Sequence, residues 1–207
     1  MTKRLEAVLF DLDDTLHDDT SAYQDAAEEV AREIAVERGI DALALKAAYV
    51  AEAEGFWHRL APDALQETMA GIRRRLWSSA LDRVGIADPA LAVRSAQRYH
   101  DYRKKRYVLF PEAAAVLAAQ RARGRRLGLI TNGFSETHRE KLGLLRLGDA
   151  FDAIFIADEV GMVKPDPLLF AHACRTLETA PARAAMVGDR YDRDISGAME
   201  AGLTTVW

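Results

Sequence analysis

Three carboxylates and a hydroxyl follow directly on a short apolar run near the beginning of the chain. The run is Ala7-Val8-Leu9-Phe10, and Asp11, Asp13, Asp14 and Thr15 come after it. An apolar run too short for a helix is typical of a strand that is buried on both faces of a parallel sheet. Because side chains two positions apart in extended backbone share a face, Asp11 and Asp13 are expected to point the same way.

Two neighbouring carboxylates repel each other, and this repulsion limits what the pair can do. It favours either a cation bound between Asp11 and Asp13, or a nucleophile with a general acid/base beside it. The simpler alternative is a polar loop in which Asp14 or Thr15 caps the next helix. The rest of the chain has to decide between these interpretations.

Three later segments carry a distinctive polar residue at or after the end of an expected strand. These residues are Thr131, Lys164 and Asp189. Strand and helix patterns alternate through this part of the chain, which predicts an α/β fold with a doubly wound parallel sheet. Ligands of such sheets bind at the carboxyl ends of the strands, so these residues and Asp11 are expected to gather there. The strands are expected at residues 7–10, 127–130, 153–157 and 184–187 and from 204 onward; the intervening helices are expected at 110–124, 136–145, 167–177 and 194–201.

A site with several carboxylates, an ammonium and a hydroxyl suits phosphoryl transfer. The carboxylates need a divalent cation, and ligation by oxygen alone favours Mg²⁺. Lys164, Thr131 and the backbone N–H groups around Asn132 and Gly133 would hold the negative oxygens of a phosphoryl group. Asp11 could then attack phosphorus to form an aspartyl-phosphate, with Asp13 as the general acid/base.

The last acidic segment offers further candidates. Asp189 directly follows an expected strand and is the best candidate for a second carboxylate ligand of the metal. Asp194 is expected either to lie in the outer shell of the metal or to cap the helix that follows. Asp192 is expected to face solvent. Lys164 lies between Val163 and Pro165, where a stiffened loop favours a functional lysine over a surface one.

Residues 17–108 differ in amino-acid composition from the rest of the chain. They are rich in Ala, Glu, Arg and Leu and nearly lack β-branched apolar clusters. Apolar residues at helical spacing predict four helices in series, and therefore a helical bundle subdomain inserted into a core of residues 1–16 and 109–207. The basic runs at 73–75 and 103–106 are expected to be solvated helix faces. The first three helices are expected to end at Gly39, before Pro62 and at Gly85, the third including Leu65, and the fourth is expected to include residues 91–102.

Composition narrows the classes of protein that fit. The formal net charge of the 207 residues is −4, which argues against a general nucleic-acid binder. No apolar run approaches the length that a bilayer requires, and the N-terminus lacks the apolar region of a signal peptide, so we expect a cytoplasmic protein without membrane contact. Cys174 is the single cysteine and lies in an apolar helical pattern, where it is expected to be a small buried side chain.

These motifs resemble those of the haloacid dehalogenase-like (HAD) hydrolase superfamily. The first motif of that family, Asp-x-Asp-x-Thr after a strand, is similar to Asp11 to Thr15, and the second motif is similar to Thr131. The third is similar to Lys164-Pro165, and the fourth to Gly188-Asp189 with Asp194 five residues later. The four motifs occur in the order of the family and span nearly the whole chain, and the helical insertion resembles the branch with a helical cap (C1, subfamily I).

The resemblance implies a role for each matching residue. Asp11 would be the nucleophile and Asp13 the acid/base, while Thr131 and Lys164 would hold the phosphoryl group. Mg²⁺ would bind Asp11, the main-chain carbonyl of Asp13, and Asp189. The implied protein is a Mg²⁺-dependent phosphatase, acting as a monomer or homodimer on a small phosphorylated metabolite such as a sugar phosphate or nucleotide. The implied fold is a Rossmann-like core with a helical cap that selects the substrate.

Alternative functions remain open from the sequence. Dehalogenases of the superfamily typically lack the second aspartate of the first motif, so Asp13 favours a phosphatase. A phosphomutase keeps that aspartate and fits the same motifs. A receiver domain, which is a phospho-aspartate signalling module, also uses paired acids, a hydroxyl and a lysine, but it lacks the helical insertion. The chain departs from the resemblance at Arg193, where relatives often carry a small polar residue, and it ends at Trp207, where relatives usually continue.

Overall fold

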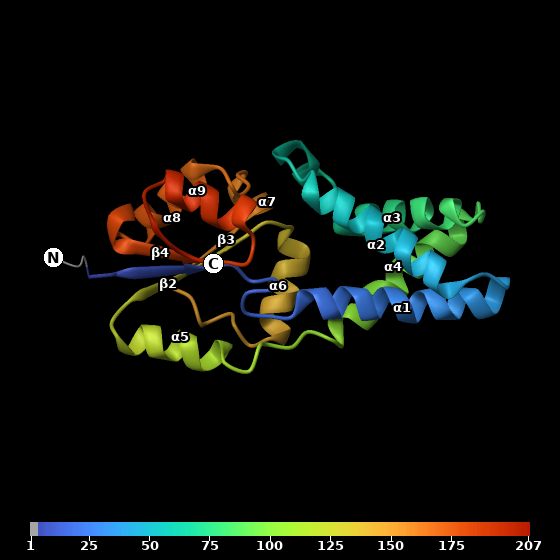
Figure 1. The fold of residues 1–207 in the computed structure, drawn as a ribbon, viewed down its shortest axis with the longest axis horizontal. Coiled ribbons are helices and arrows are strands. Elements are labelled where there is room, and N and C mark those ends of the chain that lie inside the picture. The colour runs from blue at the N-terminus through green and yellow to red at the C-terminus, as the bar shows by residue number, and fades with distance from the viewer. Residues whose placement is uncertain (1–3) are drawn as a thin grey trace. The chain divides into compact units, whose positions relative to one another are not determined.

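A parallel sheet of five strands, in the order β3-β2-β1-β4-β5, forms within residues 4–207, which are the residues that this computed structural model describes (Figure 1). β1 is the central strand because Leu9 pairs with Gly128 on one side and with Met186 on the other. Every residue of β1 is buried, as the continuous apolar run requires. The expected α/β doubly wound sheet is confirmed. The strands are β1 (Ala7–Phe10), β2 (Arg126–Thr131), β3 (Ala153–Ile156), β4 (Ala184–Val187) and β5 (Thr204–Val206).

Helices cover both faces of the sheet. In Figure 1, α5 lies on one side of the sheet and α8 and α9 lie on the other. The second face encloses a core in which Leu9 of β1 and Met186 of β4 pack with Phe170 of α8. The helices of this part of the chain are α5 (Ala113–Ala122), α6 (Ser135–Leu144), α7 (Ala157–Val160), α8 (Pro167–Thr176) and α9 (Ser196–Glu200), with a 3₁₀ turn at Pro181–Arg183.

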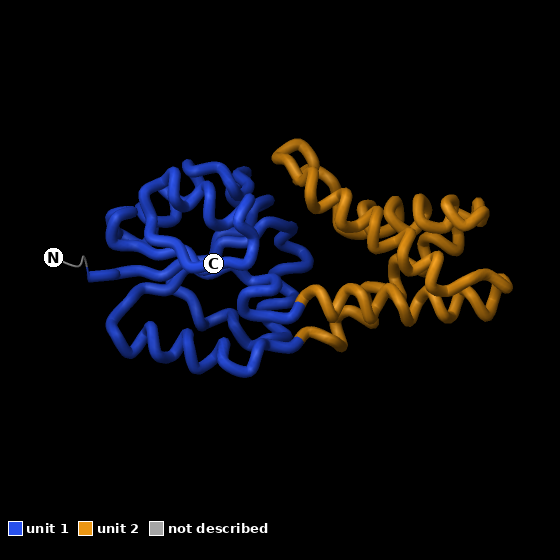
Figure 2. The backbone as a smooth tube through the Cα atoms, viewed as in Figure 1, with its two compact units in different colours: residues 1–18, 108–207 blue, residues 19–107 orange. Residues whose placement is uncertain are grey.

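The chain divides into two compact units (Figure 2). One unit contains the chain up to Asp18 and from Val108 onward, and the other is Asp19–Tyr107. In the second unit each helix contacts the next and α1 also contacts α4, so the helices form a closed bundle. Its interior is aromatic, with Tyr49 stacked on Trp77 at 4.2 Å between ring centroids. The helices are α1 (Asp19–Arg38), α2 (Ala42–His58), α3 (Met69–Arg83) and α4 (Pro89–Lys104), with a 3₁₀ turn at Pro62–Gln66.

Three local expectations were wrong. Arg73 and Arg103 are buried instead of lying on solvated faces, and Arg103 donates two hydrogen bonds of 2.7 Å to the buried carboxylate of Asp19. The helix expected to include residue 65 begins at Met69, because the Thr68 hydroxyl accepts from the backbone N–H of Gly71 and caps it there. Residues Tyr191–Ile195 form a π-helical turn, so α9 begins only at Ser196.

Two features of composition have structural counterparts. Cys174 is buried as expected, and burial raises the pKa of its thiol to about 11, so it is not an activated nucleophile. Among the helices of the described residues, none has the length and apolar character that spanning a membrane would need.

Candidate active site

Asp11 stands at the carboxyl end of the central strand. Its backbone N–H donates to the carbonyl of Val187 at 2.9 Å, which ties the end of β1 to the end of β4. The side chain is buried. Burial raises the pKa of Asp11 well above its usual range, and the carboxylates of Asp194 and Asp13 add to this, whereas the ammonium of Lys164 opposes it. The site therefore has to supply positive charge to keep this carboxylate ionised.

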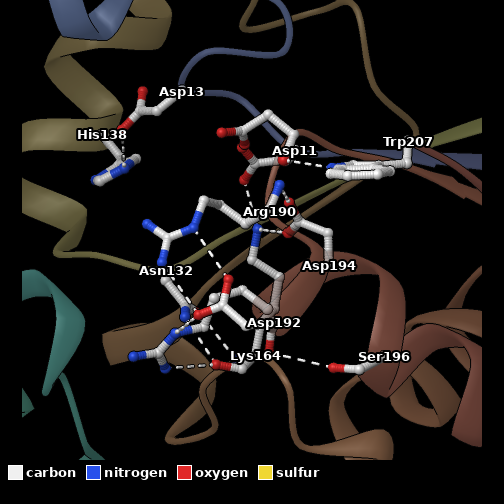
Figure 3. Close-up of polar contacts among 12 residues, drawn as sticks. Asp11, Asp13, Asn132, His138, Lys164, Arg190, Asp192, Asp194, Ser196 and Trp207 are labelled. Carbon is white, nitrogen blue, oxygen red and sulfur yellow. Dashed lines mark hydrogen bonds and ion pairs between the residues drawn. The ribbon is translucent and has the colours of Figure 1, made fainter.

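Lys164 supplies part of that charge from the loop between α7 and α8. Its Nζ lies 2.5 Å from Oδ1 of Asp11 and 2.5 Å from Oδ1 of Asp194 (Figure 3). Burial alone would lower the pKa of this lysine, but the two carboxylates outweigh burial and raise it, so the ammonium stays charged. Lys164 thus reaches Asp11, as the gathering at the strand ends predicts.

The backbone of Lys164 is held in place by two side chains. The amide of Asn132 accepts from the N–H of Lys164 at 2.7 Å and donates to its carbonyl at 2.9 Å. Arg193 donates to the same carbonyl at 3.0 Å. Arg193, which departs from the family pattern, therefore helps to fix the Lys164 loop rather than disturbing it.

Three carboxylates gather beside Lys164. Oxygens of Asp11, Asp189 and Asp194 all lie within 4.8 Å of one another. When all three are ionised, Lys164 compensates one negative charge and leaves two, which a divalent cation would neutralise. Carboxylate oxygens are also the ligands that Mg²⁺ prefers, so the donor set and its charge both fit that ion.

Asp189 and Asp194 differ in their surroundings. Asp189 lies at the exposed edge of the cluster, and partial loss of hydration, together with the carboxylates of Asp194 and Asp14, raises its pKa to about 6. Asp194 is fully buried, and its Oδ2 accepts from the backbone N–H of Arg190 at 2.9 Å. Asp194 therefore braces its own π-helical turn instead of capping α9. Asp192 is exposed and paired with Arg190, as expected.

Asp13 does not join this cluster with its side chain. β1 ends at Phe10, so Asp11 and Asp13 do not share a strand face, and Figure 3 shows Asp13 turned toward His138 of α6 while Asp11 faces Lys164. Lys141 of α6 places Nζ 2.5 Å from Oδ1 of Asp13. Sequence reasoning missed both α6 residues, although His138 and Lys141 are spaced three apart on the stripe that α6 buries.

The residues expected to hold a phosphoryl group lie at the end of β2. Thr131 is buried and is the last residue of that strand, which runs beside β1, and Asn132 and Gly133 follow directly. On the other side of the site, the indole N–H of Trp207 donates to the main-chain carbonyl of Asp189 at 2.8 Å. The carboxyl ends of β1, β2 and β4 thus supply Asp11, Thr131 and the Asp189 loop.

Comparison with known proteins identifies the family. The model of the haloacid dehalogenase-like hydrolases matches residues 5–202. The chain belongs to that family. It is 37% identical to a phosphoserine phosphatase of Thermus thermophilus, over 98% of this chain and 88% of the relative, and 32% identical to a glyceraldehyde 3-phosphate phosphatase of Methanopyrus kandleri, over 98% and 83%. Its fold matches a HAD-hydrolase of Bacillus subtilis, solved with bound magnesium, at a TM-score of 0.80 and 25% identity, covering 99% of this chain and 89% of that one.

Proposed function

We propose that this hydrolase is a Mg²⁺-dependent phosphatase that cleaves a small phosphomonoester through an aspartyl-phosphate on Asp11. The observation that carries the proposal is the buried ion pair of Asp11 and Lys164 within a cluster of three carboxylates that this lysine alone does not neutralise when all three are ionised. The phosphatase names of the two curated relatives support this reaction class. Because those two relatives are named for different substrates, the proposal extends to small phosphomonoesters as a class, with sugar phosphates and nucleotides as candidates.

In the first half of the reaction, an oxygen of the Asp11 carboxylate attacks phosphorus. The new bond joins Asp11 to phosphorus while the ester P–O bond breaks, and Asp13 gives its proton to the departing oxygen, which leaves as an alcohol. Lys164, the Thr131 hydroxyl and the backbone N–H groups of Asn132 and Gly133 hold the phosphoryl oxygens.

In the second half, water attacks the phosphorus of the aspartyl-phosphate. Asp13, now ionised, takes the proton of that water, and the bond between Asp11 and phosphorus breaks to release inorganic phosphate. Mg²⁺, held by Asp11, the main-chain carbonyl of Asp13 and Asp189, would supply positive charge that shields the nucleophile from the negative substrate. Each residue then returns to its starting protonation state.

Asp13 is what favours phosphate ester cleavage over dehalogenation. A halide leaves as a stable anion and needs no proton, whereas an alkoxide leaving group does. The contact between buried Lys141 and Asp13 supports a catalytic role for this carboxylate. A phosphomutase would share this acid/base, and it would move the phosphoryl group to a second hydroxyl instead of releasing phosphate.

A phosphate-release assay with Mg²⁺ tests the proposal. The panel would contain phosphoserine, glyceraldehyde 3-phosphate, sugar phosphates and nucleoside monophosphates. We expect turnover of at least one compound and loss of release to background in Asp11→Asn, because an amide cannot form the acyl-phosphate. Asp192→Asn is the matched control, since Asp192 is exposed and pairs with Arg190; it should retain wild-type turnover. Wild-type turnover in Asp11→Asn, or isomerisation without free phosphate, would contradict the proposal.

A further inference from the structure

Lys141 is a fully buried lysine that ends beside the carboxylate of Asp13. The side chain has 0% exposure, and its Nζ lies 2.5 Å from Oδ1 of Asp13. Burying an ammonium is costly unless it is paired, and a lysine whose only task was solubility would point into water. The residue is placed on the inner stripe of α6, where Thr137, His138 and Leu142 are also buried. The buried ammonium of Lys141 is thus paired with the Asp13 carboxylate.

His138 approaches the other oxygen of the same carboxylate. Its Nε2 lies 3.5 Å from Oδ2 of Asp13, while its Nδ1 lies 3.1 Å from the carbonyl oxygen of Phe134. Because a carbonyl only accepts, Nδ1 carries the proton of that contact, and Nε2 donates to the Asp13 carboxylate when the ring is protonated at both nitrogens. A Cβ at position 133 would lie 2.0 Å from Cε1 of His138, so Gly133 is the residue that leaves room for the ring.

Two contacts from α6 limit the rotation of the Asp13 carboxylate. The side chain is 27% exposed, and the terminal torsion of a free aspartate is broad. General acid catalysis demands that the proton-bearing oxygen lie within hydrogen-bond reach of the leaving oxygen. Contacts to both carboxylate oxygens from one rigid helix remove that rotational freedom.

We propose that Lys141 and His138 are positioning residues that hold the Asp13 carboxylate in line with the leaving group. This inference rests on the proposed phosphatase function, in which Asp13 protonates the departing alkoxide. This role predicts different effects on two kinds of phosphate ester. An ester with a poor leaving group needs the aligned proton, whereas an aryl ester with a stabilised leaving anion needs it little.

The test compares two substrates in Lys141→Met. Methionine keeps the length and apolar body of the stem and removes the charge. For an alkyl phosphomonoester that the wild type hydrolyses, we expect kcat to fall by about 10²-fold with little change in KM. For p-nitrophenyl phosphate we expect a fall of less than about fivefold. Lys141→Arg, which retains the charge, should recover part of the loss.

Three further variants complete the design. Asp13→Asn should show the same discrimination between the two esters, and Asp13→Asn combined with Lys141→Met should be no slower than Asp13→Asn alone. His138→Gln tests the same role if Lys141→Met does not fold, as judged by circular dichroism. Arg139→Gln is the control on the same helix, because Arg139 is partly exposed and pairs with Glu159; it should leave the ratio of the two rates unchanged.

The outcomes separate the two proposals. An equal loss on both esters, a change confined to KM, or full additivity with Asp13→Asn would overturn the positioning role and leave the phosphatase assignment standing. If the wild type hydrolysed neither ester with Mg²⁺ present, the phosphatase assignment and the positioning role would fall together.

Discussion

Protonation of the Asp189 carboxyl affects both the stability of the fold and the binding of a cation. The carboxyl's pKa of about 6 in the folded, metal-free protein lies above the ordinary value of 3.8, so the folded state binds this proton more tightly than the unfolded chain does. The contribution of Asp189 to stability is therefore fully present below about pH 4 and is lost as the pH rises through about 6. A cation needs the ionised form and competes with that proton.

We therefore expect Mg²⁺ to raise the melting temperature more at about pH 7.5 than at about pH 5. Thermal unfolding with and without Mg²⁺ at the two pH values measures this difference. Asp189→Asn should abolish most of the stabilisation, while Asp192→Asn, three residues away and exposed, should preserve it. Equal stabilisation by Mg²⁺ at both pH values would show that Asp189 is not a ligand.

At the scale of elements, the approach of α9 to the Lys164 loop depends on Gly197. A Cβ at this position would lie 2.0 Å from the carbonyl oxygen of Pro165, and a backbone atom cannot swing aside as a side chain can. Gly197→Ala is expected to push α9 and the loop apart, lowering the free energy of unfolding by about 1–3 kcal/mol. It should also lower kcat, because the loop carries Lys164.

Chemical denaturation and steady-state kinetics measure the two effects. Gly143→Ala is the matched control, since nothing lies within 4 Å of a Cβ there and the position is an exposed site on α6. It should leave kcat unchanged and keep or slightly increase stability. If Gly197→Ala behaved like this control, the close approach of α9 to the Lys164 loop would not matter for stability or turnover.

The elements themselves were largely predictable from sequence, because their patterns are local. Each expected strand occurs within one or two residues of its place, since a short apolar run between polar loops allows few alternatives. The gathering of Asp11, Lys164 and Asp189 followed from the rule that parallel strands end at one edge. Local patterns were therefore sufficient for the sheet and for the residues at its edge.

Contacts between distant charged residues were not predictable in the same way. Lys141 lies 128 positions from Asp13, and Arg103 lies 84 from Asp19. In the sequence, Lys141 and Arg103 cannot be told apart from exposed helix residues, because the contact with a distant carboxylate forms only in the fold. The π-helical turn at Tyr191–Ile195 was also missed; its Asp194 carboxylate accepts from the N–H of Arg190 and pairs with Lys164, which lies 30 positions earlier.

At the scale of the whole molecule, the helical unit is inserted at one point of the other unit. The backbone N–H of Asp18, before the insertion, donates to the carbonyl of Val108, after it, at 3.2 Å. The chain thus leaves and re-enters the sheet-containing unit at adjacent places. We expect that replacing residues 19–107 with a short Gly/Ser linker leaves a unit that folds, because the sheet and its hydrophobic core come entirely from the remaining residues. A cooperative thermal transition followed by circular dichroism would confirm this, and a chain without such a transition would refute it.

The central position of β1 also sets the order of events during synthesis. Leu9 leaves the ribosome well before its partners in the sheet, because Gly128 and Met186 are added more than a hundred residues later. The helical residues 19–107 have local contacts and are complete before either partner strand exists. We therefore expect the β1 segment to wait for its partner strands while the helices form, and closure of the sheet around it to be a late step of folding.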